Sequence, residues 1–219
     1  MTFSIVGRCA RTGMVGMAIS TSSIAVTGRC VWVRGKVGAV ATQNITDPAL
    51  GTRILDLMAA GTPADRAVEQ AAAENLHRAY RQISAIDMRG GTGHYTGVRA
   101  SPVAASKIGR DCVAAGNILA NDTVPAAMVR RFEAETGIHL AERLLRSLEA
   151  GLEAGGEHGP VHSAGLLVAH EQAWSIVNLR IDWADDGPIA QLRALWHAYQ
   201  PQMQDYLTRA LDPPALDKS

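Results

Sequence analysis

The sequence lacks an excess of charge of either sign, because its 21 lysine and arginine residues balance its 21 aspartate and glutamate residues. A nucleic-acid-binding protein usually carries a basic face, so this balance argues against such a partner. No apolar run approaches the roughly 18 residues of a membrane span. The N-terminus also lacks the basic segment and long apolar stretch of a signal peptide. We therefore expect a cytoplasmic protein with no nucleic-acid or membrane partner.

Cysteine is scarce, and the usual metal motifs are missing. The three cysteines show no CxxC spacing, and their odd number argues against a disulfide framework. No HExxH motif occurs, and the one HxxxH spacing joins His158 to His162 across Gly159-Pro160. That spacing places two ligands on one face only in a helix, which a Gly-rich loop disfavours. We expect no metal and no cofactor. A metal-assisted hydrolase that uses these two histidines is the weakest of the three functional hypotheses considered below.

The 47% hydrophobic content is enough for a substantial core, and its pattern alternates between groups of strands and pairs of helices. Runs of strands followed by helix pairs favour an α+β fold over a parallel sheet. We predict a four-layer αββα sandwich, with two mainly antiparallel sheets between helix layers. Residues 1–185 would form this domain, and residues 186–219 a helical extension packed on it. The expected strands are 3–7, 14–19, 30–34, 37–42, 81–88, 93–97, 111–115, 163–169 and 173–181, and the expected helices are 48–60, 62–75, 123–135, 138–154, 188–199 and 201–211.

The first candidate for catalysis is Thr2. A side chain this small normally allows the cell to remove the initiator Met1. A free α-amine has a pKa of roughly 7.7–8.0, so part of it is neutral near physiological pH. Such an amine can take the proton of the threonine hydroxyl and activate it as a nucleophile. The alternative is that Thr2 only begins the first strand.

Hydroxyl side chains follow the second strand, which should pair with the first. The end of the second strand of a hairpin lies beside the start of the first strand. Hydroxyls there can bind the Thr2 amine or a substrate carboxylate, or they can satisfy backbone groups of a local turn. The residues concerned are Ser20, Thr21, Ser22 and Ser23.

Basic residues surround the third expected strand. A cation near the N-terminal amine disfavours its protonation and helps to keep it a base. Arg34 can also bind a substrate carboxylate through two hydrogen bonds. The sequence leaves open whether Arg29, Arg34 or Lys36 takes this position, and salt bridges or solvated turns are the alternative roles.

Amide side chains end two of the expected strands directly before helices. Gln43 and Asn44 precede a helix start that Asp47 and Pro48 already cap. Amides and backbone N–H groups that converge at such a point can stabilise an oxyanion. Asn117 ends another strand in the same way, and we expect it to donate to the tetrahedral intermediate.

Several segments in one order carry a family resemblance: MTFSIVGR, TGMVGMAISTSS, VGAVATQNITDPALG, RQISAID, AAGNILAN and AGGEHGP…SAGLLV. They resemble the family called domain of unknown function 1028, of the N-terminal nucleophile (Ntn) hydrolase superfamily. The resemblance implies an αββα sandwich that hydrolyses amide bonds with Thr2 after Met1 is removed. It also implies polar site residues near Ser20–Ser23 and a basic one near Arg29 or Arg34. Some members carry Gly-Gly-Asp and then Arg-Gly-Gln-Ser, where this chain has Gly-Gly-Glu157 and then His-Ser163, so the role of the 157–162 loop stays open.

The leading hypothesis is an amidohydrolase that cleaves a small amide, peptide or N-acyl bond. The alternative is a non-catalytic protein that binds a small molecule or serves in assembly on the same scaffold. The sequence does not name the substrate. We expect a homodimer or a higher homo-oligomer, since the terminal helices carry apolar residues.

Overall fold

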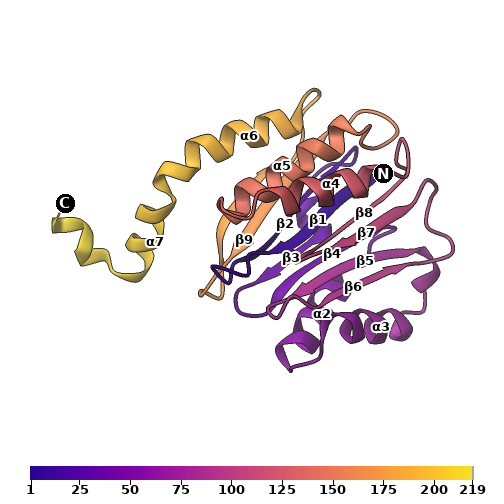
Figure 1. Ribbon diagram of the computed structural model, residues 1–219, viewed down its shortest axis with the longest axis horizontal. Coiled ribbons are helices and arrows are strands. Elements are labelled where there is room, and N and C mark those ends of the chain that lie inside the picture. The colour runs from indigo at the N-terminus through magenta and orange to yellow at the C-terminus, as the bar shows by residue number, and fades with distance from the viewer. Residues whose placement is uncertain (219) are drawn as a thin grey trace.

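The computed structural model describes residues 1–218 and contains two β-sheets packed face to face (Figure 1). The strand order is β10-β9-β2-β1-β8-β7 in a six-stranded sheet and β3-β4-β5-β6 in a four-stranded sheet. All neighbouring strands are antiparallel. The strands are β1 (Thr2–Arg8), β2 (Val15–Thr21), β3 (Val31–Arg34), β4 (Gly38–Asn44), β5 (Arg81–Asp87), β6 (Thr92–Thr96), β7 (Ala105–Gly109), β8 (Cys112–Asn117), β9 (Ser163–Ala169) and β10 (Ser175–Ile181).

Helices cover the outer face of each sheet. The six-stranded sheet is covered by α4 (Val124–Ala134), α5 (Leu140–Glu153) and α6 (Pro188–Tyr199), and the four-stranded sheet by α2 (Pro48–Ala59) and α3 (Ala64–Glu74) (Figure 1). The predicted four-layer αββα sandwich of class α+β is therefore confirmed. Shorter elements are α1 (Thr27–Cys30), η1 (Arg78–Tyr80), η2 (Gln200–Gln202), α7 (Met203–Leu211) and η3 (Pro213–Lys218).

Strand β1 shows how the sequence divides the interior into layers. Successive side chains of a strand point to opposite faces. Phe3 and Ile5 therefore pack among the helices that cover the six-stranded sheet. Ser4 and Val6 face the four-stranded sheet, where Ser4 bonds to Gln43 and Val6 joins the apolar layer between the sheets. Polar residues on this inner face thus place hydrophilic groups inside the sandwich.

The helix that follows β4 begins where its capping residues predict. Asp47 accepts a hydrogen bond from the Ala49 N–H at 3.1 Å, and Pro48 occupies the first turn of α2. This cap fixes the start of α2 just after β4, whose last residue is Asn44.

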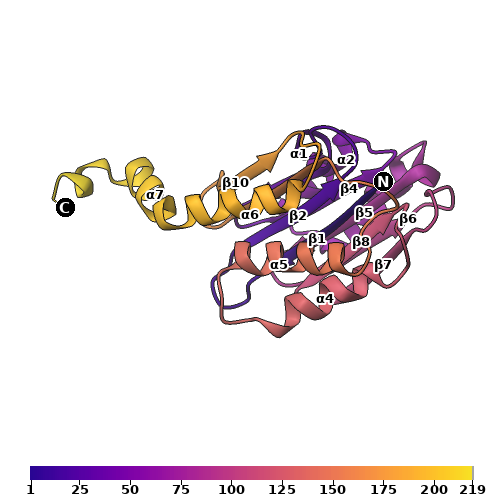
Figure 2. The same ribbon diagram turned by 90° about the horizontal axis from the view of Figure 1, so that it is seen from above.

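The last part of the chain packs on the outside of the six-stranded sheet and then leaves it. Trp196 of α6 is fully buried in the core over the six-stranded sheet, and its indole N–H donates to Glu142 of α5 at 2.7 Å. Helix α7 and the turn after it extend away from the body of the molecule (Figures 1 and 2). Within residues 1–218, no helix combines the length and the apolar character that crossing a membrane requires.

Candidate active site

Thr2 lies at the first position of β1, in the interior of the six-stranded sheet. Its backbone is paired with Asn117 of β8, and the neighbouring pair Phe3 and Ser20 joins β1 to β2. The hairpin thus brings the end of β2 beside Thr2, as expected from the sequence. The Thr2 side chain is buried, with 6% of its surface exposed.

Two hydroxyl groups meet at the peptide bond before Thr2. The Thr2 hydroxyl and the Thr21 hydroxyl both donate to the carbonyl oxygen of Met1, and the two hydroxyl oxygens are 3.3 Å apart. The nucleophile that the sequence predicts therefore already lies against a carbonyl group. Thr21 supplies a second donor to the same oxygen.

A chain of amide groups lies deeper between the two sheets. The Ser4 hydroxyl donates to Gln43 Oε1 at 2.8 Å, and Gln43 Nε2 donates to Gln82 Oε1 at 2.7 Å. Asn117 Nδ2 donates to the same Gln82 oxygen at 3.1 Å. All four side chains are buried, so the network links the two sheets under the Thr2 position. Sequence reasoning missed Ser4 and Gln82, although each is a polar residue within a strand that is otherwise largely apolar.

Three acceptor atoms near this end of the sandwich have no hydrogen-bond partner. They are Asn117 Oδ1 and both carboxylate oxygens of Glu157. Glu157 forms an isolated antiparallel bridge with Leu119, just beyond the end of β8. Burial raises the pKa of Glu157 to about 7, and Ser22, the chain's amino terminus and His162 partly oppose the rise. Ser22 lies beside the carboxylate, but neither oxygen reaches it with hydrogen-bonding geometry. The sequence carries no signal for Glu157 beyond a charged residue in a Gly-rich loop.

Of the four hydroxyl residues at the end of β2, two lie at Thr2 or Glu157 and two form hydrogen bonds elsewhere. Thr21 contacts Met1 and Thr2, and Ser22 lies beside Glu157. Ser20 donates to the carbonyl of Ser163 at 3.0 Å, while the Ser23 backbone N–H donates to Thr21 at 3.3 Å. Thr21 and Ser22 are thus the members that the fold brings to Thr2 and Glu157.

The basic candidates lie apart from one another. Arg34 pairs with Asp56 at 2.9 Å, and the β3–β4 register places it opposite Gly38, at the other end of β4 from Gln43. Lys36 pairs with Glu171 at 2.9 Å.

Arg29 lies in α1, after the loop that follows β2. Its guanidinium donates to the carbonyl of Ile24 at 2.6 Å. The pKa of the neighbouring Cys30 thiol is raised by burial and lowered by both Arg29 and the chain's amine. The roles of Arg29, Arg34 and Lys36 in tuning the amine or binding substrate stay predictions.

Asn44 is tied to neighbouring loops. Its Nδ2 donates to the Tyr80 carbonyl at 2.5 Å, and its Oδ1 accepts from the Ser101 N–H at 3.2 Å. These bonds hold an Asn44 backbone whose φ is 71°, a left-handed conformation that asparagine tolerates. Gln43, in contrast, points into the layer between the sheets. A direct role of either residue in substrate binding stays a prediction.

The two histidines of the 157–162 loop, whose role the sequence leaves open, have different surroundings. His158 is exposed, whereas the His162 ring stacks on Trp183 and its Nδ1 lies 2.9 Å from the Ala184 carbonyl. The His162 backbone N–H donates to Thr21 at 2.8 Å, so the loop borders the Thr2 end of the sheet. Within residues 1–218, no group of three or more histidine, cysteine, aspartate or glutamate side chains could hold a metal ion.

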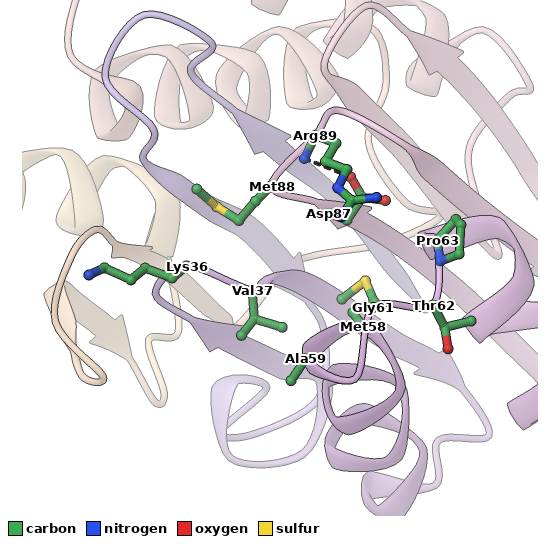
Figure 3. A pocket seen from close by; sticks show the side chains of 10 residues that line it. All are labelled: Lys36, Val37, Met58, Ala59, Gly61, Thr62, Pro63, Asp87, Met88 and Arg89. Carbon is green, nitrogen blue, oxygen red and sulfur yellow. Dashed lines mark hydrogen bonds between the residues drawn. The ribbon is translucent and has the colours of Figure 1, made fainter.

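The cavity in Figure 3 lies at the opposite end of the sandwich. It has a volume of about 290 Å³ and is lined by residues around the start of β4 and the end of β5, including Lys36 and Asp87. Asp87 already accepts bonds from the backbone N–H groups of Ala64, Arg89 and Gly91, and Lys36 is paired with Glu171. Thr2 is not among its lining residues, so this cavity does not serve the candidate site.

Comparison with known proteins finds a family whose members resemble most of this chain. The family model that matches residues 2–192 is described as a family of unknown function, DUF1028. The crystal structure of protein SPO2555 from Silicibacter pomeroyi, described with the same family, is 31% identical with a TM-score of 0.84. The alignment covers 90% of this chain and 85% of that one. None of the curated proteins matches the chain.

More distant solved structures also align along most of their length. Anbu (ancestral beta-subunit) from Yersinia bercovieri is 10% identical with a TM-score of 0.43, covering 93% of this chain and 96% of its own. An Anbu (Gly-1) mutant from Hyphomicrobium sp. strain MC1 is 15% identical with a TM-score of 0.44, covering 94% and 97%. The family match spans most of the sequence and agrees with the similarity to SPO2555, so the chain belongs to the DUF1028 family of unknown function.

Proposed function

We propose that the chain is an amidohydrolase of the Ntn type, with Thr2 as its nucleophile once Met1 has been removed. The observation that carries this proposal is the position of the Thr2 hydroxyl against the carbonyl of the preceding peptide bond. A second hydroxyl, that of Thr21, donates to the same carbonyl oxygen. A nucleophile and a donor that converge on one carbonyl are the parts that attack on an amide needs.

In the first half of the reaction, the Thr2 oxygen attacks the carbonyl carbon of the substrate amide. The hydroxyl proton passes to the neutral amine of Thr2, and the carbonyl oxygen becomes an oxyanion held by the Thr21 hydroxyl. The amine then gives the proton to the leaving nitrogen as the C–N bond breaks. The products are a free amine and an ester between Thr2 and the acyl group.

In the second half, water attacks the ester carbonyl and gives a proton to the Thr2 amine. The ester C–O bond breaks, the carboxylic acid leaves, and the threonine hydroxyl recovers its proton. Asn117 is paired with Thr2 across β1 and β8, and its amide is anchored to Gln82. We assign Asn117 to orienting the site around the oxyanion.

Removal of Met1 also explains access to a buried nucleophile. Thr2 is only 6% exposed, whereas Met1 is 38% exposed and lies directly before it in the chain. Loss of Met1 would free both the amine that serves as the base and the space that a substrate acyl group needs. The substrate is therefore a small amide, peptide or N-acyl compound.

The test uses protein whose Thr2 terminus has been verified by mass spectrometry, screened against a library of amides and dipeptides. We expect Thr2→Ala to abolish turnover by at least a factor of about 10³ and Thr2→Ser to keep part of it, because serine retains the hydroxyl. Thr123→Ala, at an exposed threonine near α4, is the matched control. Uniform retention of Met1 in the native host, or full activity of Thr2→Ala, would contradict the proposal.

A non-catalytic function is the second candidate, and the observation that favours it is Met1 itself. With Met1 in place, its carbonyl engages the hydroxyls of Thr2 and Thr21 and leaves no free amine at Thr2. A binding or assembly protein would work in this form, and Thr2→Ala would leave its ligand binding unchanged.

A further inference from the structure

Glu157 is a buried ionisable residue at the Thr2 end of the sandwich, and within residues 1–218 no other side chain pairs with its carboxylate. Its exposed fraction is 4%, and neither carboxylate oxygen accepts a hydrogen bond. Among the residues that the structure describes, no lysine, arginine or histidine lies within ion-pair distance of it. Burying a carboxylate without a partner is costly, so a ligand that brings a hydrogen-bond donor to Glu157 would gain binding energy there.

The backbone fixes Glu157 close to the candidate nucleophile. Glu157 bridges Leu119, and the next residue donates its N–H to the Ile118 carbonyl at 2.8 Å. These contacts continue the line of β8, whose last residue is the partner of Thr2. On the other side Ser22 follows directly on Thr21. The carboxylate therefore lies at the rim where β1, β2 and β8 end together.

The chain itself shows what kind of group approaches this carboxylate. The amine of Met1 makes no hydrogen bond to Glu157, but its positive charge lowers the pKa of the carboxyl, against the larger rise caused by burial. The carbonyl of the same Met1 residue engages the hydroxyls of Thr2 and Thr21. Met1 thus places its carbonyl at the hydroxyls of Thr2 and Thr21, and its amine lies within electrostatic range of the carboxylate.

A substrate acyl group would occupy the place that Met1 leaves. In the proposed reaction, the scissile carbonyl must meet the Thr2 hydroxyl, as the Met1 carbonyl does. An acyl residue with an amino group on its α-carbon then directs that amino group toward Glu157. An ammonium group supplies three N–H donors, and the nearby acceptors without partners are the Glu157 oxygens and Asn117 Oδ1.

Resting on the proposed function, we infer that Glu157 binds the α-ammonium group of the substrate, so that the enzyme acts on aminoacyl amides and short peptides with a free amino end. Hydrolysis then releases a free amino acid and an amine. Amides whose acyl group has no charged amine leave the buried carboxylate unpaired and are poor substrates.

The test compares methionine p-nitroanilide with 4-(methylthio)butanoyl p-nitroanilide, which has the same acyl chain without the amine. With Thr2-terminated protein, we expect kcat/KM to be at least about tenfold higher for the aminoacyl substrate. Glu157→Gln should lower that value about tenfold, mainly by raising KM, and should leave the desamino substrate within about twofold. Glu153→Gln, at an exposed carboxylate of α5, is the matched control and should change neither.

Two outcomes would overturn this inference while leaving the proposed function intact. In one, the wild-type enzyme cleaves both substrates equally well. In the other, Glu157→Gln slows both substrates equally, which would place the carboxylate at the amine of Thr2 instead of the substrate's amine.

A binding measurement separates the inference from catalysis. Calorimetry with the Thr2→Ala variant should detect methioninamide and at least tenfold weaker binding of 4-(methylthio)butanamide. Equal binding of the two amides, or none, would overturn the ammonium site. Selective binding of methioninamide without hydrolysis of any amide by Thr2-terminated protein would instead refute the proposed function alone.

Discussion

At the scale of single residues, the Glu157 carboxylate has a consequence for stability as well as for binding. A carboxyl whose pKa is higher in the folded chain than in the unfolded chain favours folding only while it is protonated. Its ordinary pKa is 4.5, and burial raises the pKa of Glu157 to about 7. The stabilisation of the protonated form is thus fully present below pH 4.5 and is lost as the pH rises through 7.

We therefore predict that Glu157→Gln becomes more stable than the wild-type protein as the pH rises. The two should have similar free energies of unfolding near pH 4.5, and the variant should gain on the order of 3 kcal/mol by pH 8. Urea unfolding of both proteins, with the same amino terminus, at pH 5 and pH 8 measures this difference. A difference that does not change with pH would contradict the prediction.

The residues of the candidate site differ in how well they can be predicted from the sequence. Thr2 follows from its position in the chain, and Thr21 from hairpin geometry, because both depend on local spacing. Gln82 and Glu157 reach the site through contacts between distant segments. Burial and missing partners identify them, and those properties exist only after the chain has folded.

At the scale of secondary structure, the strands with apolar residues are the ones that the sequence predicts well. β1, β2, β4, β5 and β9 are buried along nearly their whole length, so hydrophobicity marks them. The sequence missed β7, whose residues Ala105–Gly109 lie at the edge of the sheet and are mostly exposed. Its hydrogen bonds to β8 hold it, and such bonds leave no apolar pattern in the sequence.

Helix α6 depends on a single large anchor, Trp196. This side chain is fully exposed in the unfolded chain and fully buried in the native one, and its N–H bonds to Glu142. We predict that Trp196→Ala lowers the free energy of unfolding by about 3–5 kcal/mol, the usual cost of removing a buried aromatic side chain. Urea unfolding monitored by circular dichroism measures it. Trp174→Ala, at a half-exposed aromatic residue just before β10, should stay within about 0.5 kcal/mol, and an equal loss in both variants would refute this role of α6.

At the scale of the whole molecule, helix α7 leaves an apolar surface outside the sandwich. It extends from the body (Figures 1 and 2) and exposes Tyr206 and Leu211 by 46% and 58%. A short helix with such side chains is marginal by itself in water. A second copy of the chain that covers them would account for the homodimer or higher homo-oligomer that the sequence predicts.

We expect the full chain to run as at least a dimer in size-exclusion chromatography with light scattering. A chain that ends at Gln202 should run as a monomer, and Trp174→Ala, at an exposed aromatic residue near β10, is the control that should not change the mass. A monomeric full-length chain would contradict the oligomer, and an unchanged mass after truncation would exclude α7 as its contact.

The interior position of β1 in the sheet also affects how far aminopeptidases can trim the amino terminus. Chain ends usually fray, and cellular aminopeptidases digest them from the tip. Here the backbone from Thr2 onward is paired with β2 on one side and β8 on the other. An aminopeptidase therefore cannot bind it as a free chain end. Trimming would therefore stop by itself after one residue. If Met1 is removed as proposed, the strand pairing that positions Thr2 would also protect it from further trimming.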